Sequence, residues 1–172
     1  MSGLSKKRRA KLQQKLDEDY GYRQYADRDV EVREGACGHG VHAVRQFLPG
    51  ELVIEICGQV LSQKKYDGST YVMEMDDEWY LEPTIPGAYL NHSCNPNAEL
   101  LKLTDSSMGI IAICNIEPGS EITFDYQWTA GDWVPRCQCG APNCRGWVVG
   151  ADSLEEMKEF AKEQKQKSKR KK

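Results

Sequence analysis

Short apolar runs rich in β-branched residues, separated by turn-forming residues, dominate the chain from Val30 onward. Runs of about four to eight such residues are typical of strands, whereas a helix repeats its apolar residues about every three or four positions. The pattern predicts strands at residues 41–44, 51–56, 71–75, 79–81, 110–115 and 121–126. Many short strands and few helices indicate a β-rich α+β fold rather than a layered α/β sheet.

Two similar turns lead into predicted strands, Leu48-Pro49-Gly50-Glu51 and Glu117-Pro118-Gly119-Ser120. Proline presets the φ angle of its turn position, and glycine accepts a positive φ at the next one. Their similarity predicts two related turn-and-strand units within one fold.

Helices are expected only at the two ends. Residues 4–18 are compatible with a basic helix, although their leucines are too sparse to define it. Near the C-terminus, Ser153 followed by Glu156 forms a capping box, which predicts a helix that starts there. One side of this helix is expected to pack on the domain before the helix frays into a Lys-rich tail. That side consists of Leu154, Met157, Phe160 and Ala161.

The 172 residues are enough for one domain with a substantial core. No apolar run has the length of a membrane span, and the N-terminus lacks the apolar region of a signal peptide. These features favour a soluble intracellular protein, with no membrane as a partner.

Charge is distributed unevenly along the chain. Residues 1–16 carry six basic side chains and no acid, and residues 158–172 carry eight basic against two acidic ones. Of the 23 basic and 26 acidic residues in total, nine and 24 therefore lie between these arms. An acidic body favours a basic peptide partner, and the arms favour nucleic acid or another polyanion. Alternatively, the arms are simply solubilising tails.

Seven cysteines exclude a disulfide framework that uses all of them, and their clustering favours a metal site in a reducing compartment. Cys137, Cys139 and Cys144 supply three thiolates, and a closed tetrahedral zinc site needs a fourth ligand. The alternative is a redox pair or ordinary surface thiols. Three further cysteines occur in or beside apolar runs and are expected to be small buried side chains. These are Cys37, Cys57 and Cys114.

Two further motifs are ambiguous by themselves. Gly38-His39-Gly40 lets a backbone approach a ligand but is also typical of an ordinary turn, and it lacks the third glycine of a Rossmann fingerprint. Asn91-His92-Ser93-Cys94-Asn95-Pro96-Asn97 is dense in side chains that bond to the backbone, which is also typical of a buried loop. Within it, a satisfied core histidine is the simpler interpretation of His92.

Taken together and in this order, these motifs resemble SET-domain protein-lysine methyltransferases with a zinc-binding post-SET extension, from about residue 25 to residue 150. The matching stretches are residues 38–43, 49–58, 91–97, 119–126 and 137–147. Gln24-Tyr25-Ala26-Asp27 and Phe124-Asp125-Tyr126-Gln127 are most similar to the branch that methylates lysine thirty-six of histone H3.

The resemblance implies a SET domain, a β-clip of small curved sheets with a C-terminal pseudoknot. It places a basic N-terminal arm at residues 1–24, the SET domain at 25–130, a post-SET zinc segment at 131–150 and a helix with a basic tail at 151–172. Cys94 becomes the fourth zinc ligand beside Cys137, Cys139 and Cys144.

The resemblance also implies S-adenosyl-L-methionine as methyl donor and assigns the site residues. Tyr126 is the catalytic tyrosine, Phe124 tunes the number of methyl groups, and Tyr71 contributes to both catalysis and cofactor binding. Trp147 packs on the adenine. The complete set of cofactor-binding residues is Gly38, His39, Gly40, Tyr71, Asn91, His92, Tyr126 and Trp147. Phe124 and Tyr126 can instead be core residues of a strand.

The implied function is methylation of a histone-tail lysine to the di- or trimethyl state, in the nucleus on chromosomes. Further implied partners are nucleosomal DNA, bound by the basic arms, and an accessory subunit.

Some positions depart from the family pattern. Ile56 and Ala88 replace a tyrosine and an arginine common in the family, and the wall of the peptide groove between residues 66 and 91 is short. Two alternatives therefore stay open: a methyltransferase of a non-histone protein, and a catalytically weak module that binds chromatin.

Overall fold

The computed structural model describes residues 25–35, 38–65 and 71–170. The predicted basic helix at residues 4–18 and the side chain of Cys37 lie outside these residues. The chain divides into two compact units. The described parts of residues 25–91 and 96–124 form the sheet unit, and residues 92–95 with 125–170 form the cysteine unit.

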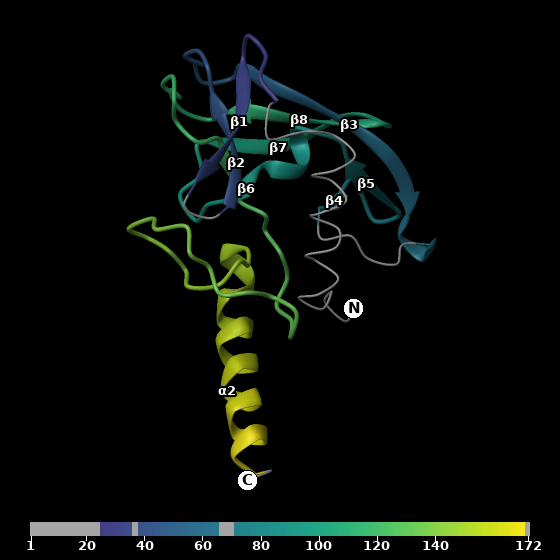
Figure 1. The fold of residues 1–172 in the computed structure, drawn as a ribbon. Helices are drawn as coiled ribbons and strands as arrows, with labels where there is room; N and C mark the ends of the chain where they lie inside the picture. The colour runs from purple at the N-terminus through teal and green to yellow at the C-terminus, as the bar shows by residue number, and fades with distance from the viewer. Residues whose placement is uncertain (1–24, 36–37, 66–70, 171–172) are drawn as a thin grey trace. The chain divides into compact units, whose positions relative to one another are not determined.

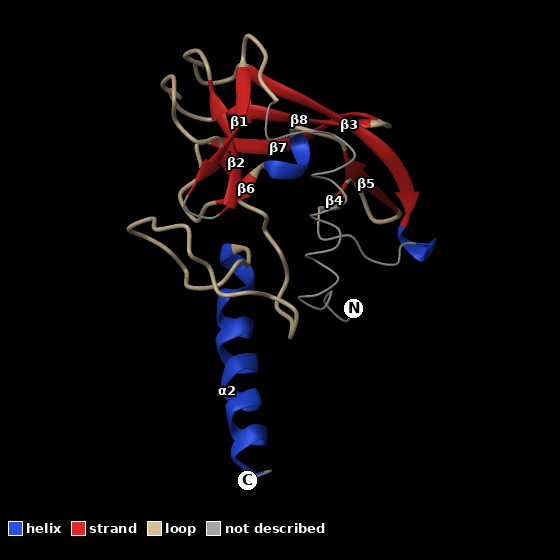
Figure 2. Ribbon diagram, in the orientation of Figure 1, coloured by secondary structure: helices blue, strands red, loops and turns tan. Residues whose placement is uncertain are grey.

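The sheet unit is built mainly from strands, as Figure 2 shows, and they pair antiparallel in its hairpin and in its five-stranded sheet. A hairpin pairs β1 (Val30–Gly35) with β2 (Gly38–Ala43). A second sheet has the order β4-β5-β3-β8-β7, and its long strand β3 is visibly curved (Figure 1). Its strands are β3 (Leu52–Ser62), β4 (Met73–Glu74), β5 (Trp79–Pro83), β7 (Ala98–Thr104) and β8 (Ser107–Ala112). A third, small sheet pairs β6 (Asn91–His92) with β9 (Thr123–Phe124). The predicted β-rich fold of small curved sheets is confirmed.

Alternation along the strands builds the core of this unit. Val30 and Val32 in β1 lie two residues apart and are both buried, and so are Ile54 and Ile56 in β3. Because successive side chains of a strand point to opposite faces, these strands give the core a residue at every second position. The fully buried Ile110 of β8 completes this layer.

Both predicted Pro-Gly turns are present, with φ of 87° at Gly50 and 84° at Gly119. In each turn, the N–H after the glycine donates to the carbonyl three residues earlier at 3.0 Å. These are the features of a type II turn, which needs glycine at its third position.

The two turn units also pair with each other reciprocally. Phe47 and Ile116, which precede the turns, exchange N–H···O bonds of 2.9 and 3.0 Å. The glycine N–H of each turn then donates to the strand that leads into the other turn, at Ala112 in one case and Ala43 in the other. The predicted relationship between the two turn-and-strand segments is therefore confirmed. Their mutual hydrogen bonds hold these two segments of the sheet unit together.

Some strand predictions were incomplete. Strands β1 and β7 were not predicted, because charged residues on their exposed sides interrupt the apolar pattern. The segment 121–126 was predicted as one strand, but only Thr123–Phe124 is regular. Gly38-His39-Gly40 is not a free turn, since it forms the first half of β2.

The prediction that Cys57 and Cys114 are buried was wrong, since both are exposed. Cys57 directly follows the buried Ile56 on β3 and so falls on the opposite face of the strand. Cys114 lies just beyond the end of β8.

The cysteine unit consists of loops and one long helix, α2 (Leu154–Arg170), which begins directly after Ser153 as predicted (Figure 2). Its core is Val134, Val148, Val149 and Met157, with Leu154 and Phe160 packed against it. The predicted apolar side of the helix is thus confirmed. The helix extends to Arg170, through a segment without proline, glycine or β-branched residues. Among the described residues, no helix combines the length and apolarity needed to cross a membrane.

We expect Gly58→Ala to destabilise the protein by about 1–3 kcal/mol. Gly58 pairs with Pro83 across β3 and β5, and a Cβ there would collide with the backbone carbonyl of Glu82, which cannot turn aside. Gly35→Ala is the matched control, because its Cβ would meet only the Gly38 carbonyl, at 3.5 Å. Thermal unfolding of the two variants tests this, and an equal loss of stability would contradict it.

Candidate functional site

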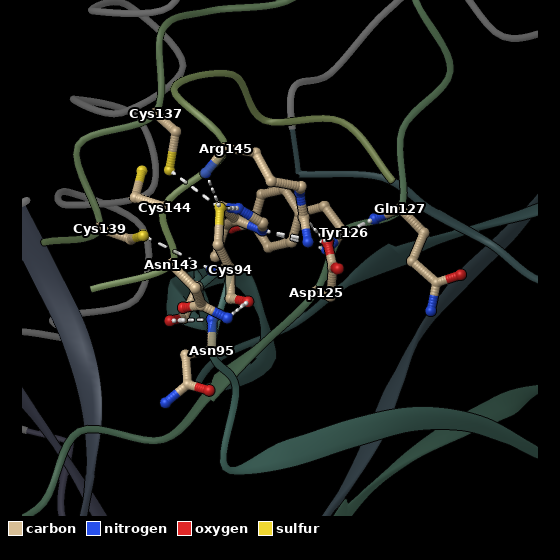
Figure 3. Close-up of polar contacts among 12 residues, drawn as sticks. Cys94, Asn95, Asp125, Tyr126, Gln127, Cys137, Cys139, Asn143, Cys144 and Arg145 are labelled. Atoms are coloured by element: carbon tan, nitrogen blue, oxygen red, sulfur yellow. Dashed lines mark hydrogen bonds and ion pairs between the residues drawn. The ribbon is translucent and has the colours of Figure 1, made fainter. Parts of the chain in front are cut away.

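Four cysteine side chains converge in the cysteine unit, although Cys94 is more than forty residues away from the others in sequence. The sulfur atoms of Cys94, Cys137, Cys139 and Cys144 all lie within 4.8 Å of one another. Figure 3 shows them gathered around one point, with Cys94 from the loop after β6 and the rest from the loop before α2. The predicted set of four is therefore brought together.

The dimensions of the cluster fit a tetrahedral metal site. Cys94 Sγ and Cys137 Sγ are 3.7 Å apart. Four sulfurs at about 2.3 Å from a central zinc ion would be separated by about 3.8 Å. Backbone N–H groups also point at the sulfurs: Arg145 N–H donates to Cys94 and Gly146 N–H to Cys144, each at 3.4 Å. Such donors stabilise thiolates, the form in which cysteine binds a metal.

The thiols differ in how readily they ionise. Burial raises the pKa of Cys94 and of Cys137. Burial also opposes ionisation of Cys139, but the N–H groups of Cys94 and Ala141 donate to its sulfur and bring its pKa down to about 6. A bound cation would favour ionisation of all four thiols.

His92 sits between this cluster and the chain after β9. Its side chain is only 6% exposed. Nε2 lies 3.4 Å from Cys94 Sγ, and Nδ1 accepts a hydrogen bond of 3.2 Å from the backbone N–H of Tyr126. Burial lowers the pKa of His92, Asp125 opposes this, and Arg145 adds to it. A neutral ring that accepts at Nδ1 carries its proton on Nε2, where the sulfur can accept it.

A partly buried ion pair stabilises the same region. Arg145 Nη2 donates to Asp125 Oδ1 at 2.7 Å, with side-chain exposures of 12% and 19%. The backbone N–H of Arg145 also contacts Cys94 Sγ. Arg145 therefore connects the cysteine cluster to Asp125, as His92 connects it to Tyr126. Figure 3 shows Arg145 and Asp125 beside the cluster.

Aromatic rings continue from His92 along the cysteine unit. The ring centroids of His92 and Tyr126 are 5.3 Å apart, and those of Tyr126 and Trp128 are 4.9 Å apart. Trp147 packs against the core of this unit, and the Arg136 guanidinium lies 3.6 Å from the centroid of its ring.

In the sheet unit, Asn91 organises the glycine motif. Its amide nitrogen donates to the His39 carbonyl at 3.0 Å and to Glu121 Oε1 at 2.7 Å. Gly40 packs against this pair so closely that a Cβ would collide with the Glu121 carboxylate. These contacts fix the Gly38–Ala43 strand beside β6 through side chains rather than through the ladder alone.

A second group in the sheet unit surrounds Tyr89. The ring centroids of His39 and Tyr71 lie 6.0 and 6.2 Å from that of Tyr89. Phe124 is buried at the end of β9. Of the predicted residues of the sheet unit, Gly40 and Asn91 thus lie at Glu121, Tyr71 lies at Tyr89, and His39 contacts both groups.

Sequence reasoning gave no role to Glu121, Tyr89, Asp125 or Arg145. Glu121 and Arg145 do lie within the motifs that carry the resemblance, but their partners are distant in sequence: 30 residues for Glu121 and Asn91, and 20 for Arg145 and Asp125. A local pattern carries no information about such pairs.

Known proteins match this chain in sequence. The family model described as SET domain matches residues 38–127. The histone-lysine N-methyltransferase Set2 of Drosophila melanogaster is 34% identical over 144 residues, which are 73% of this chain and 6% of that protein. The H3 lysine-36 specific histone-lysine N-methyltransferase of Cryptococcus neoformans is 32% identical over 152 residues, covering 78% of this chain and 18% of that protein. Human SETD2, also named a histone-lysine N-methyltransferase, is 30% identical over 87% of this chain and 6% of its own length. The chain spans a small fraction of the length of each of these relatives.

Solved structures are similar as well. KRYPTONITE in complex with mCHH DNA, an H3(1-15) peptide and SAH matches with a TM-score of 0.60 at 27% identity, over 70% of this chain and 29% of that chain. Its complex with mCHG DNA and SAH matches with a TM-score of 0.62 at 26% identity, over the same shares.

We expect Cys139→Ser to lose bound zinc and to loosen residues 125–150, because three thiolates do not close a tetrahedral site. Zinc content per chain and hydrogen exchange measure the two effects. The exposed Cys57→Ser and Cys114→Ser are matched controls and should keep the ion. A Cys139→Ser protein with a full complement of zinc would show that this cluster does not hold the metal.

Proposed function

This chain belongs to the SET-domain family, whose model covers residues 38–127, and we propose that it is an S-adenosylmethionine-dependent protein-lysine N-methyltransferase acting on a histone tail. The main support for the proposal is that residues 38–127 include nearly all of the residues assigned to catalysis and cofactor binding. Only Trp147 lies outside this range. Those inside it are Gly38, His39, Gly40, Tyr71, Asn91, His92, Phe124 and Tyr126.

The relatives support the substrate class. Set2 and SETD2 are named histone-lysine N-methyltransferases, and the Cryptococcus neoformans relative is named as specific for lysine-36 of H3. The KRYPTONITE complex holds an H3 peptide together with SAH, the product that S-adenosylmethionine becomes once its methyl group has left. The branch that methylates lysine thirty-six is therefore our proposed assignment for this chain.

The chemistry needs positioning more than a strong base. The pKa of free lysine is about 10.4, so the nucleophilic amine is scarce at neutral pH. A narrow apolar channel disfavours the ammonium form by desolvation, and a nearby cationic sulfonium disfavours it by repulsion. The remaining task is to align amine, methyl carbon and sulfur, which lowers the barrier by several kcal/mol.

Each residue type suits that task. S-adenosylmethionine, when bound, supplies an electrophilic methyl group on a sulfonium. The Tyr126 hydroxyl can orient the methyl group, and aromatic walls hold a partly methylated cation. Gly38, Gly40 and Asn91 let the backbone approach the cofactor closely, and the Asn91 amide is already fixed by Glu121. Trp147 offers a ring face for the adenine.

The four-cysteine cluster is proposed to hold one structural zinc ion, because four thiolates in a tetrahedron are typical of zinc. Loops 92–95 and 125–150 contain little regular secondary structure. Zinc binding would therefore supply folding free energy to this part of the chain. We place the post-SET segment at residues 131–150, after a SET domain at 25–130.

The partners follow from the charges. The acidic middle of the chain suits a basic histone tail, and the basic arms at residues 1–16 and 158–172 suit nucleosomal DNA. These features support our proposal that the activity acts on chromatin in the nucleus, with an accessory subunit as a further partner.

A second candidate function rests on Ile56. This side chain is buried and packs so tightly on Gly87 that a Cβ there would lie 2.6 Å from Ile56 Cγ2. A core residue thus stands where the family commonly has a tyrosine of the lysine channel. That change favours a catalytically weak module that binds chromatin.

Tyr126→Phe distinguishes the two functions. For an enzyme, we expect methyl transfer from labelled S-adenosylmethionine to nucleosomes or free histones to fall about 100-fold or more, while cofactor affinity is kept. Radiolabel on histone bands and calorimetric binding of the cofactor are the measurements. Tyr25→Phe is the matched control, since its hydroxyl bonds only locally to Asp27 at 2.8 Å. Cofactor binding without transfer to any protein by the unmodified chain would favour the binding module.

Phe124→Tyr should shift the products towards monomethyl-lysine. Phenylalanine lacks a hydroxyl that could anchor a water or the amine, so it leaves space for a bulkier methylated substrate; tyrosine would fill that space. Mass spectrometry of the modified histone measures the ratio of mono-, di- and trimethyl forms. Phe160→Tyr on α2 is the control. An unchanged ratio in Phe124→Tyr would remove this residue from control of the methylation state.

A further inference from the structure

The His92 side chain contacts both the sulfur cluster and the backbone of Tyr126. Nε2 approaches Cys94 Sγ at 3.4 Å, and Nδ1 accepts from the Tyr126 N–H at 3.2 Å. The ring is nearly buried, and it meets the tyrosine ring in an edge-to-face arrangement, with 5.3 Å between the centroids. Each polar atom of this imidazole therefore has a defined partner.

The contacts of Nδ1 favour one tautomer. Nδ1 lies 3.5 Å from Asp125 Oδ1, but the shorter contact of 3.2 Å is with the N–H of Tyr126, which leaves no room for a proton on this nitrogen. An N–H that points at Nδ1 requires a lone pair there, so the neutral ring places its proton on Nε2. That proton faces Cys94 Sγ, and a thiolate accepts such a bond more strongly than a thiol. Loading the cluster with a cation makes Cys94 a thiolate, and it also holds that sulfur in one place.

We propose that His92 is a positioning residue that transmits the geometry of the metal-loaded four-cysteine site to Tyr126. This inference rests on the proposed function, in which Tyr126 is catalytic. Tyr126 follows β9 (Thr123–Phe124), and its backbone N–H donates to Nδ1 of His92 at 3.2 Å. This bond ties the position of the tyrosine backbone to that of the imidazole. A displacement of about 1 Å in a reacting group costs about 100-fold in rate, so small shifts of the ring would matter.

Arg145 supplies a neighbouring link that reaches a different residue. Its backbone N–H contacts Cys94 Sγ and its guanidinium holds Asp125, but it makes its contact at the Asp125 carboxylate and not at the Tyr126 backbone. His92 is thus the direct connection, and Arg145 steadies the residue before it.

Two substitutions of His92 test the hydrogen bonds of Nδ1 and Nε2 separately. The side-chain oxygen of His92→Asn occupies roughly the place of Nδ1 and can accept from Tyr126 N–H, but nothing reaches Cys94. The amide of His92→Gln occupies roughly the place of Nε2 and can donate to Cys94, but the acceptor for Tyr126 is lost. A residue with a purely structural role would not distinguish them.

We expect opposite effects in the full-length protein. Release of zinc to a chelator should be about 10- to 100-fold faster in His92→Asn than in His92→Gln, as is usual when a partner of a metal ligand is lost. At saturating zinc and cofactor, kcat should fall further in His92→Gln than in His92→Asn, with little difference in cofactor KM. Equal changes in both variants, or the opposite order, would overturn the proposal.

Asn143→Ala is the matched control for contact with Cys94. Asn143 donates to the Cys94 carbonyl at 3.4 Å, and its interaction does not involve the sulfur or Tyr126. It should leave the order of the two His92 variants intact. If Asn143→Ala reproduced the kcat loss of His92→Gln, the effect would belong to the loop as a whole and not to the imidazole.

The unmodified protein gives an independent test that needs no variant to fold. A long-range proton–nitrogen NMR spectrum of the zinc-loaded chain should show the His92 proton on Nε2 and a bare Nδ1. A proton on Nδ1 would overturn the link to Tyr126. Neither this spectrum nor zinc release depends on methyl transfer, so failure of the proposed function would be seen separately, as a chain that transfers no methyl group.

Discussion

The sulfur of Cys94 is the point on which the order of the cysteine unit depends. It lies 3.7 Å from Cys137 Sγ, receives the backbone N–H of Arg145 and faces Nε2 of His92. Loops of this kind lose conformational entropy on folding and have few ladder hydrogen bonds to compensate for it. A metal ion held by the four cysteines, as we propose, would concentrate the compensation in one place, and Cys94 would pass it to the residues that contact it.

The sheet unit gains its order differently. Its two Pro-Gly turns are joined by the mutual hydrogen bonds of Phe47 and Ile116, and each turn is also bonded to the strand before the other. Neither turn can move without disturbing both. The glycine motif is held in the same manner, since Asn91 bonds to the His39 carbonyl and to the Glu121 carboxylate. In this unit, hydrogen bonds between residues distant in sequence fix the positions of the loops. In the cysteine unit, the contacts of the cysteine sulfurs have that role.

This contrast explains how far the sequence could be interpreted in advance. The Pro-Gly turns, the cysteine spacing and the start of α2 after Ser153 were predicted because each depends on residues that are close in sequence. Strands β1 and β7 were not predicted, because the charged residues on their outward faces interrupt the apolar pattern. Glu121 and Arg145 were missed as structural residues because their partners become neighbours only after folding. The exposure of Cys57 depends on which face of β3 turns inward, and its apolar surroundings in sequence do not reveal that face.

The backbone beyond Tyr126 carries a further constraint. Gln127 has a φ of 50°, an uncommon value for a residue other than glycine. The rings of Tyr126 and Trp128, on either side of this kink, lie 4.9 Å apart, and a Cβ at Gly150 would make an ordinary van der Waals contact of 3.4 Å with Gln127 Cα. Gly150 N–H then donates to the Trp128 carbonyl at 2.9 Å. Strain of this kind persists only where surrounding contacts enforce it, and it clusters where function needs a fixed geometry. Since methyl transfer in line depends on positioning, a tyrosine constrained by His92 on one side and by this kink on the other is suited to that chemistry.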